Sequence, residues 1–264
     1  MSTTLDNVEF LARSSNRFAA LEVLIEGPRD RAELRESIDA SSSTVGRVLD
    51  DLKTKGWVTQ TNHRYEATRT GRLVGTEFAR LLDAMEAVEQ LQGVVDWLPT
   101  EEMDFDVTTL QDAEITTATQ SSPFRPTLRM AARLGEADEV RMLAYAAIPQ
   151  VLTAVQKAVV EGTQTFEAVV TPDLLDAVRD DAEMTAQARS VADADRAAVF
   201  CSGDSVPYSL AVADGTLVMD VTDDRRLPRA LVETENETAV SWAESVYDSY
   251  RQDAEPVSSG RIAV

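Results

Sequence analysis

The segment 70–96 carries apolar residues at the spacing of a coiled coil. Successive apolar positions lie four, three, four, three and seven residues apart, and Gln92 occupies the step that would divide the last interval. Because Leu82, Leu91 and Val94 broaden the apolar stripe, packing on the protein's own core stays an open alternative. The spacing predicts one long helix whose dimerisation seam consists of Val74, Phe78, Leu81, Met85, Val88 and Val95.

Charge differs strongly between the two sides of this helix. Residues 1–72 hold 11 basic and 11 acidic residues, whereas the rest of the chain holds 14 basic and 35 acidic residues and carries the whole net charge of −21. A length of 264 residues also allows two ordinary domains. We predict an N-terminal domain at 1–72, a long helix at 73–98, a C-terminal domain at 99–256 and a frayed tail at 257–264.

The choice of basic residue is also biased. Lys occurs at only three positions, while the other 22 basic residues are Arg. Together with the acidic excess this is typical of a salt-rich cytoplasm, where molar salt screens charges within about 3 Å. An ordinary acidic protein is the alternative. No run approaches the roughly 18 apolar residues of a bilayer span, and no signal pattern opens the chain, so we expect a cytoplasmic protein without a membrane partner.

Cys201 is the single cysteine and His63 the single histidine. This excludes intrachain disulfides, Cys/His zinc clusters and most cysteine–histidine nucleophile pairs. The C-terminal domain also lacks a nucleophile elbow and a phosphate-binding glycine loop, so we predict no enzyme activity, no cofactor and no metal. Asp220, Asp223 and Asp224 could hold a hard cation, although such a cluster in so acidic a chain is more typical of a solvated surface. We interpret Cys201 as a small buried side chain.

The N-terminal domain has the predicted order helix, helix-turn-helix, hairpin. One or two amphipathic helices span 6–26, and a short helix follows Asp30. A further helix begins at the hydroxyl cluster 41–44 and stops at Gly56. Two short β-prone runs joined by the polar turn at 60–63 then predict a small hairpin.

The run from Ser41 to Val58, SSSTVGRVLDDLKTKGWV, is followed by the spacing Tyr65-x-x-Thr68-x-x-Gly71. This pattern combines a helix cap, core spacing, a stop glycine and a wing strand. It resembles the winged helix-turn-helix of prokaryotic transcription regulators in the ArsR/MarR class, over about residues 15–72. The resemblance implies that this domain binds double-stranded DNA.

A recognition helix enters the major groove, roughly 12 Å wide, when its outer face is small and polar near its N-terminus. Arg47 can then reach guanine or a phosphate, and the hairpin tip would approach the minor groove, as the resemblance implies. For Lys53 and Arg69 a solvated helix surface is the alternative. The predicted DNA-binding residues are Ser42, Ser43, Thr44, Gly46, Arg47, Lys53, Asn62, His63, Arg64 and Arg69.

Beyond a polar stretch at 100–112, β-rich and helical runs alternate, which predicts an α/β domain with an antiparallel end. Strands are expected at 115–119, 140–146, 165–170, 197–201, 208–212, 217–221 and 230–233. Helices are expected near 125–134, 149–161, 172–180, 182–191 and 238–253.

The strand that ends Arg141-Met142-Leu143-Ala144-Tyr145, the stretch 162–175 and the block 206–223 carry a second resemblance. They are similar to the effector half of archaeal winged-helix regulators, such as the middle domain of methanogenesis regulatory proteins and TrmB-like sensor domains. With the N-terminal half, the layout resembles a haloarchaeal regulator of this type. Ligands of open α/β sheets collect at the carboxyl ends of strands, so we nominate Tyr145, Thr171 and Tyr208 for an effector pocket, with core packing as the alternative.

The sequence therefore predicts a homodimeric, sequence-specific DNA-binding transcription regulator. Because salt weakens phosphate contacts, binding must depend on base contacts and on a dimer that contacts two half-sites. A small-molecule effector or another signal would act on the C-terminal domain. A protein-interaction adaptor, which docks its winged helix on another protein, is the first alternative, and an enzyme with an appended helix-turn-helix is the second.

Overall fold

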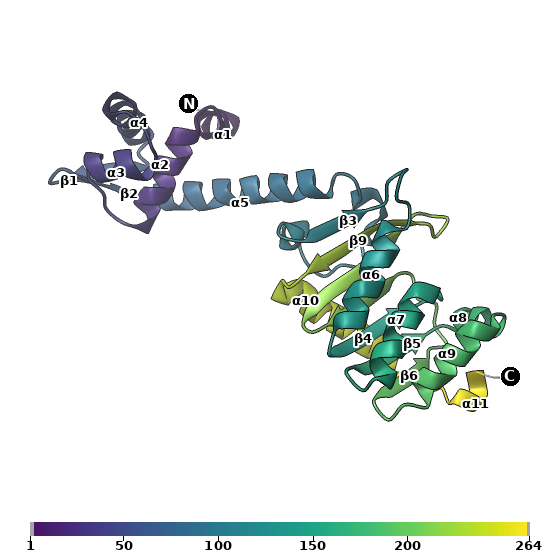
Figure 1. Cartoon of the computed structure of the whole chain (residues 1–264). Helices are drawn as coiled ribbons and strands as arrows, with labels where there is room; N and C mark the ends of the chain where they lie inside the picture. The colour runs from purple at the N-terminus through teal and green to yellow at the C-terminus, as the bar shows by residue number, and fades with distance from the viewer. Residues whose placement is uncertain (1–2, 263–264) are drawn as a thin grey trace. The chain divides into compact units, whose positions relative to one another are not determined.

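The computed structural model describes residues 3–262 and divides the chain into two units (Figure 1). The boundary falls between Met85 and Glu86, inside helix α5 (Arg69–Leu91), so the helix is not set apart as a third segment. Within residues 3–262, no helix combines the length and apolar character that a membrane crossing needs. Each unit has its own buried apolar core.

The N-terminal unit confirms the predicted order of helix, helix-turn-helix and hairpin. The segment 6–26 forms two helices, because the chain breaks its helical run at Arg13 and Ser14. Capping boxes at Thr3 and Asp30 begin the first and third helices. The elements before α5 are α1 (Thr4–Ala12), α2 (Ser15–Glu26), α3 (Arg31–Ser37), α4 (Ser42–Thr54), β1 (Val58–Thr61) and β2 (Arg64–Ala67).

The start of α5 explains the motif Tyr65-x-x-Thr68-x-x-Gly71. The Thr68 amide donates to the Trp57 carbonyl at 2.8 Å, and the Thr68 hydroxyl donates to the Gly56 carbonyl at 2.8 Å. The first turn of α5 therefore lies against the chain that leaves α4. A Cβ on Gly71 would lie 2.0 Å from the Trp57 carbonyl oxygen, so this position requires glycine.

The hairpin has a shorter turn than the sequence predicts. Thr61 pairs with Arg64, and only Asn62 and His63 lie between them, with φ angles of 48° and 67°. This left-handed pair is the geometry of a two-residue hairpin turn. Gln60 therefore belongs to β1 rather than to the turn, and Arg64 is the first residue of β2 rather than part of the tip.

The two ends of helix α5 pack in different hydrophobic cores. Phe78 is buried in the core of the N-terminal unit, with its ring 5.0 Å from that of Phe18, and Val74 packs against the same core. Leu91 is buried in the C-terminal unit. The predicted seam is therefore wrong at Val74 and Phe78, since their side chains already fill an interior.

The exposed apolar side chains of α5 lie between these two ends. Leu81, Met85 and Val88 are exposed, as is Leu82 beside them. The helix also ends at Leu91, earlier than predicted, and Val95 lies in the separate 3-10 turn η1 (Val95–Trp97). Val95 is thus exposed, but it does not belong to α5, the helix on which the dimerisation seam was predicted.

The C-terminal unit confirms an α/β fold, with most predicted strands and helices displaced by no more than two residues. The hairpin turn at Asp214 and Gly215 has both residues at positive φ. The elements are η2 (Val107–Leu110), β3 (Glu114–Thr117), α6 (Arg125–Glu136), β4 (Glu139–Ala144), α7 (Pro149–Val160), β5 (Thr165–Val170), α8 (Pro172–Arg179), α9 (Ala182–Ala192), β6 (Ala197–Cys201), β7 (Ser209–Ala213), β8 (Thr216–Thr222), β9 (Pro228–Thr234), α10 (Glu237–Gln252), β10 (Glu255–Pro256) and α11 (Ser259–Ile262).

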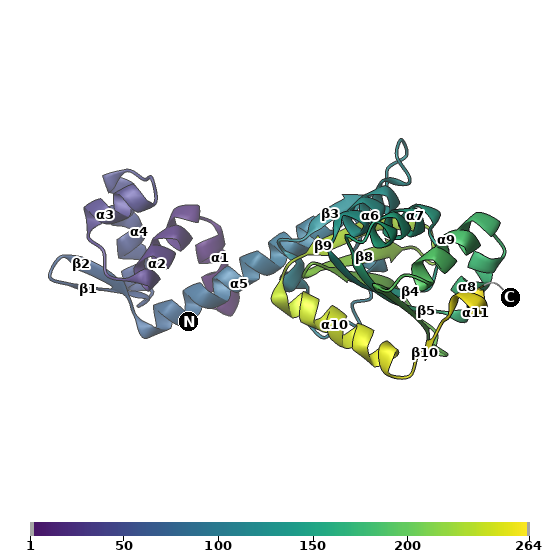
Figure 2. The ribbon, with the colours of Figure 1, turned by 60° about the horizontal axis from the view of Figure 1, so that its bottom comes forward.

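One mixed sheet organises this unit, in the strand order β10-β6-β5-β4-β7-β8-β9-β3. Strands β4, β5 and β6 are parallel to one another, and the remaining pairings are antiparallel. Helices α6, α7 and α9 cover one face and α10 covers the other (Figure 2). The sheet therefore has a parallel half, which gives it a carboxyl edge, and an antiparallel end.

The last residues are not a frayed tail. Strand β10 pairs with β6, and Val257 and Ile262 are buried in the core on the α7 and α9 side. The predicted tail at 257–264 is therefore wrong for 257–262, because these apolar side chains are covered by the helices. Residues 263–264 lie outside the described part of the chain.

Candidate nucleic-acid interface and effector pocket

Helix α4 presents a small polar face outward. The Ser41 hydroxyl caps the helix by accepting the Thr44 amide at 3.2 Å, and it also lies 2.9 Å from the Thr44 hydroxyl. Ser42 and Ser43 follow on the exposed surface. A Cβ on Gly46 would meet nothing within 4 Å. The inward positions Val45, Val48, Leu49 and Leu52 are all buried, which fixes the orientation of the helix.

Arg47 extends from this outer face. Its side chain is exposed and has no hydrogen bond or ion pair with any residue among 3–262. The first turn of α4 contains no acidic residue. A helix N-terminus also carries partial positive charge from its free amide groups. The N-terminal half of α4 therefore offers hydroxyls, amide dipoles and an arginine without opposing carboxylates.

Two other predicted cations are also exposed. Arg69, at the start of α5, has no ion pair or hydrogen bond within the part of the chain that the structure describes. Lys53 lies at the other end of α4, where its Nζ is 3.4 Å from Gln60 Oε1 on β1. Lys55, by contrast, packs its ammonium 5.0 Å from the Phe10 ring centroid and donates to Asn7. Lys55 therefore ties the end of α4 to α1.

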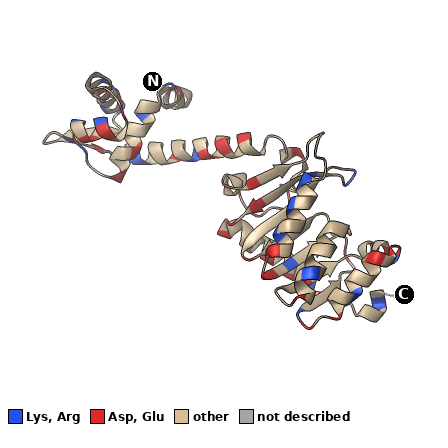
Figure 3. Cartoon of the chain, in the orientation of Figure 1, with Lys and Arg blue, Asp and Glu red and all other residues tan. Residues whose placement is uncertain are grey.

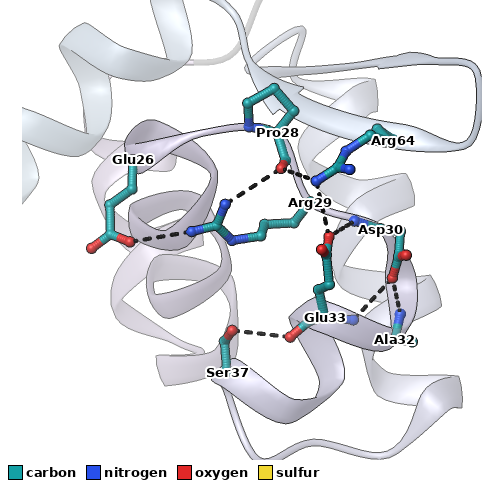
Figure 4. Close-up of polar contacts among 8 residues, drawn as sticks. All are labelled: Glu26, Pro28, Arg29, Asp30, Ala32, Glu33, Ser37 and Arg64. Atoms are coloured by element: carbon teal, nitrogen blue, oxygen red, sulfur yellow. Dashed lines mark hydrogen bonds and ion pairs between the residues drawn. The ribbon is translucent and has the colours of Figure 1, made fainter.

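Arg64 points back to its own domain (Figure 4). Its Nη2 donates to the Pro28 carbonyl at 2.8 Å and to Glu33 Oε2 at 3.2 Å. Glu33 also accepts the Asp30 amide at 2.7 Å, and the amides of Glu33 and Ala32 lower the pKa of Asp30. Arg64 thus joins the wing to the capping box of α3. These bonds hold the guanidinium within the domain, whereas its contact with DNA stays a prediction.

A backbone bridge supports the same arrangement. Arg29 and Tyr65 exchange backbone hydrogen bonds of 2.9 and 2.7 Å, so the chain before α3 pairs with β2. Asn62 and His63 remain exposed at the tip. Arg64 and Tyr65, on the strand that follows the turn, therefore tie the wing to the rest of the domain, while Asn62 and His63 stay exposed.

Arg72 is occupied as well. Its Nη1 donates to the Ile25 carbonyl near the end of α2, which satisfies one of the last carbonyls of that helix. Arg72 therefore joins the first turn of α5 to the end of α2. The residue that the sequence analysis missed in this unit is Arg17, whose guanidinium binds Asp51 on α4 and lies over the Phe10 ring. In the sequence Arg17 is a single arginine within a predicted helix, and no motif marks it as a contact between helices.

The structure brings together two of the three predicted effector residues. Thr171 Oγ1 lies 3.5 Å from the Tyr145 carbonyl oxygen, and the Tyr145 hydroxyl lies 3.0 Å from Thr222 Oγ1. Both Tyr145 and Thr171 are buried, and Thr171 caps α8 by accepting the Leu174 amide. Their polar groups are therefore engaged within the fold.

Tyr208 packs against the same hydrophobic core as Tyr145, on the α10 side of the sheet. Its ring lies 5.9 Å from that of Trp242 on α10, and no hydrogen bond joins it to Tyr145 or Thr171 within residues 3–262. Burial raises the pKa of the Tyr208 hydroxyl to about 12. Tyr208 is thus a packing residue on the α10 face, and the effector pocket nominated for the three residues stays a prediction.

Only Asp224 of the acidic cluster is exposed to solvent, whereas Asp220 and Asp223 are withdrawn from it. Asp220 is 9% exposed and faces Ser209 across the β7–β8 ladder. Burial alone raises the pKa of its carboxyl to about 6. Asp223 instead binds the Arg229 guanidinium and accepts the amides of Arg225 and Leu227. The described residues 3–262 contain no group of His, Cys, Asp or Glu that could hold a metal ion.

Cys201 is buried on β6, as predicted. Burial raises the pKa of its thiol, which keeps it protonated and poorly nucleophilic. Cys201 therefore acts as a small packing residue.

Comparison with known proteins gives two domain matches. Residues 5–90 match the model described as the HVO_A0261 N-terminal domain, and residues 123–253 match that of the methanogenesis regulatory protein FilR1, middle domain. No curated protein matches the sequence.

Similar solved structures include TrmBL2, an archaeal chromatin protein, at 16% identity and a TM-score of 0.43, covering 97% of this chain and 100% of that one. Nuc, a phospholipase D family member from Salmonella typhimurium, is 12% identical with a TM-score of 0.43, covering 55% of this chain and 99% of that one. An O-methyltransferase family protein from Burkholderia thailandensis is 14% identical with a TM-score of 0.24, covering 77% and 65%.

Proposed function

We propose that this chain, which joins an HVO_A0261 N-terminal domain to a FilR1 middle domain, is a DNA-binding transcription regulator. The observation that carries the proposal is the outer face of α4, where Ser42, Ser43 and Gly46 surround the unpaired Arg47. FilR1 is described as a methanogenesis regulatory protein, which supports a regulatory role for a chain that carries its middle domain.

The face of α4 suits the major groove for steric and chemical reasons. Small side chains at 42, 43 and 46 let the helix backbone approach the base edges. Arg47 can then donate two parallel hydrogen bonds to guanine O6 and N7, the commonest specific contact of this kind. Ser42 and Ser43 can bond to bases or phosphates, and Arg69 can bond to a phosphate beside the groove.

The wing would contribute a second contact. Asn62 and His63 are exposed at a turn whose base is fixed by Arg64 and Tyr65. A turn held in this way loses little conformational entropy when it binds, which favours affinity. We therefore assign the tip residues, and not Arg64, to the DNA contact.

We further propose that the regulator is a homodimer joined through α5. Exposed Leu81, Leu82, Met85 and Val88 support this, because monomeric proteins seldom leave several large apolar side chains adjacent on one helix. From Glu77 to Glu89 the helix also carries four acidic residues and one basic residue, Arg80 (Figure 3). Two such helices repel each other in dilute buffer, so salt would favour the dimer.

The C-terminal unit would then sense a ligand or another signal. A ligand alters DNA affinity only if it binds one conformation of the protein better than another. The burial of Tyr145 and Thr171 leaves their site without free polar groups, so we do not assign the effector to them.

Binding to DNA can be tested with the full chain. Duplexes would be selected from a randomised pool in molar salt, and affinity would be measured by fluorescence anisotropy for the wild type and Arg47→Ala. We expect Arg47→Ala to weaken binding by about 5- to 150-fold, because a bidentate contact to guanine contributes about 1–3 kcal/mol. Arg13→Ala is the matched control, since Arg13 is exposed on α1 and pairs with Glu9.

Two outcomes would contradict this proposal. One is equal affinity of Arg47→Ala and the wild type for the selected duplex. The other is the absence of any selected duplex at low, intermediate and molar salt, which would favour the alternative that the winged helix binds another protein.

A further inference from the structure

A cavity of about 100 Å³ lies within the C-terminal unit, between the sheet and the helices on one of its faces. Its floor is formed by β4 and β5, where Ala144 lies beside Val170 and Ala168 beside Met142. Val155 of α7 contributes to the opposite wall. The two alanines leave space that larger side chains would fill.

The lining of this cavity is chemically uniform. Every residue that lines it is Ala, Val, Leu, Ile, Met or Phe, so no lining side chain carries a charge or a hydrogen-bonding group. A buried water needs about two to four polar partners, which these side chains do not supply. A cavity of this kind favours an apolar occupant over water.

The cavity reaches the protein surface at the carboxyl end of β4. Ala146, Ala147 and Ile148 line it and form the loop between β4 and α7. Ala146 is exposed and the other two are half-buried, so the mouth is bordered by small side chains. The carboxyl edge of parallel strands is where open α/β sheets bind their ligands. Ile262 of α11 also lines the cavity.

We propose that this cavity binds a small uncharged apolar molecule. An apolar cavity of about 150 Å³ in another protein holds benzene, so the smaller cavity here takes a ligand of no more than about six non-hydrogen atoms. A charged or strongly hydrated ligand is excluded, because it would lose its water without gaining a partner. The assignment as the effector site rests on the proposed regulatory function, whereas the binding itself does not require DNA.

The test uses the full chain with labelled Ile, Leu and Val methyl groups, observed by NMR in the absence of DNA. Benzene and xenon are the apolar probes, and glycerol is the polar probe. We expect saturable shifts of the methyl signals of Val151, Val155 and Leu174 with both apolar probes and not with glycerol. Val218 and Leu231 are internal controls, since they are buried on the same face but do not line the cavity.

Two variants change the cavity in opposite directions. Ala147→Phe places a ring at the half-buried mouth and should weaken benzene binding at least tenfold, with exposed Ala132→Phe on α6 as the matched control. Val155→Ala enlarges the cavity and should tighten the binding of toluene relative to benzene. If Ala147→Phe does not fold, the Val155→Ala variant still tests the proposal, because its affinity for toluene relative to benzene should increase.

The proposal is overturned if neither benzene nor xenon gives saturable shifts at the lining methyls. It is also overturned if Val218 and Leu231 shift as much as the lining residues, which would indicate general partition into the core. Because no DNA is present, either result leaves the proposed DNA contact at Arg47 untouched.

Discussion

Arg17 and Asp51 join α2 to α4 through a pair of hydrogen bonds, with Arg17 Nη2 2.8 Å and Nε 3.2 Å from Asp51 Oδ2. The same guanidinium donates to the Phe10 carbonyl at 3.0 Å and lies over the Phe10 ring. One arginine therefore fixes the positions of α1 and α2 against the C-terminal half of α4. In the proposed complex with DNA, this contact would also weaken the repulsion between Asp51 and a phosphate.

Replacing Arg17 should destabilise the N-terminal unit without removing its core. Arg17→Met keeps most of the apolar stem but leaves Asp51 unpaired. We expect a loss of about 1–2 kcal/mol in unfolding free energy, since hydrogen bonds to charged groups contribute more than exposed ion pairs. Chemical denaturation followed by Trp57 fluorescence, in a chain whose Trp97 and Trp242 are replaced by Phe, measures it. Arg13→Met, which removes an exposed i,i+4 pair with Glu9, should change stability by less than about 0.5 kcal/mol.

Replacing two glycines of the winged helix with alanine should have opposite effects on the stability of the N-terminal unit. Gly46 lies inside α4 with open space around its absent Cβ, so Gly46→Ala should stabilise the unit by roughly 0.5–1 kcal/mol through helix propensity. Gly71→Ala would place its Cβ 2.0 Å from the Trp57 carbonyl oxygen and should destabilise it by several times that amount. Thermal denaturation of both variants tests the pair, and equal effects would contradict the account of Gly71.

These two glycines also show what the sequence could predict. The motif around Gly71 predicted a winged helix through its resemblance to known regulators, and the cap at Ser41 and the stop at Gly56 lie where local chemistry places them. Arg64 could not be placed in this way. Its partners Pro28 and Glu33 are more than 30 positions away in sequence. Its role also depends on a hairpin turn that is two residues shorter than predicted.

Long-range packing explains the other differences. The heptad spacing of α5 correctly predicted a helix. Its apolar residues, however, pack in two different cores, because Phe78 contacts Phe18 in the N-terminal unit and Leu91 is buried in the C-terminal unit. The cavity beneath α7 has no sequence signature either, because alanines such as Ala144 and Ala168 are ordinary in strands. Its existence depends on how the helices lie over the sheet.

The exposed part of α5 should control the oligomeric state. Met85 is 52% exposed and Leu81 is 42% exposed, so Met85→Asp should leave the fold intact while it disrupts a seam with a second copy. Light scattering after gel filtration in molar salt should give twice 28.9 kDa for the wild type and 28.9 kDa for Met85→Asp. Leu128→Asp, at an exposed apolar position on α6, is the control and should remain dimeric.

Lowering the salt should weaken the same dimer. The acidic residues from Glu77 to Glu89 would repel their counterparts as the Debye length grows from about 3 Å at 1 M to about 10 Å at 0.1 M. The dissociation constant from sedimentation should therefore rise as salt falls. A wild type that is monomeric at every salt concentration, or a Met85→Asp variant that stays dimeric, would contradict the seam.

Asp220 should make the stability of the C-terminal unit depend on pH. Burial raises the pKa of its carboxyl to about 6 in the folded chain, whereas an unfolded aspartate titrates near about 3.9. Between these values the folded state holds the proton more tightly, so ionising Asp220 as the pH rises costs stability. The penalty is absent below about pH 4 and complete above about pH 7, where it approaches roughly 3 kcal/mol.

Asp220→Asn isolates this contribution, because asparagine has a similar shape and no charge to lose. Subtracting the unfolding free energy of the wild type from that of the variant should give a value that increases from pH 4 to pH 7 and then stays constant. Asp195→Asn, an exposed position with the same change in formal charge, is the control. A difference for Asp220→Asn that is flat across this range would show that the carboxyl ionises as easily in the fold as in water. In that case Ser209, which pairs with Asp220 across the β7–β8 ladder, would have to stabilise the ionised carboxylate of Asp220.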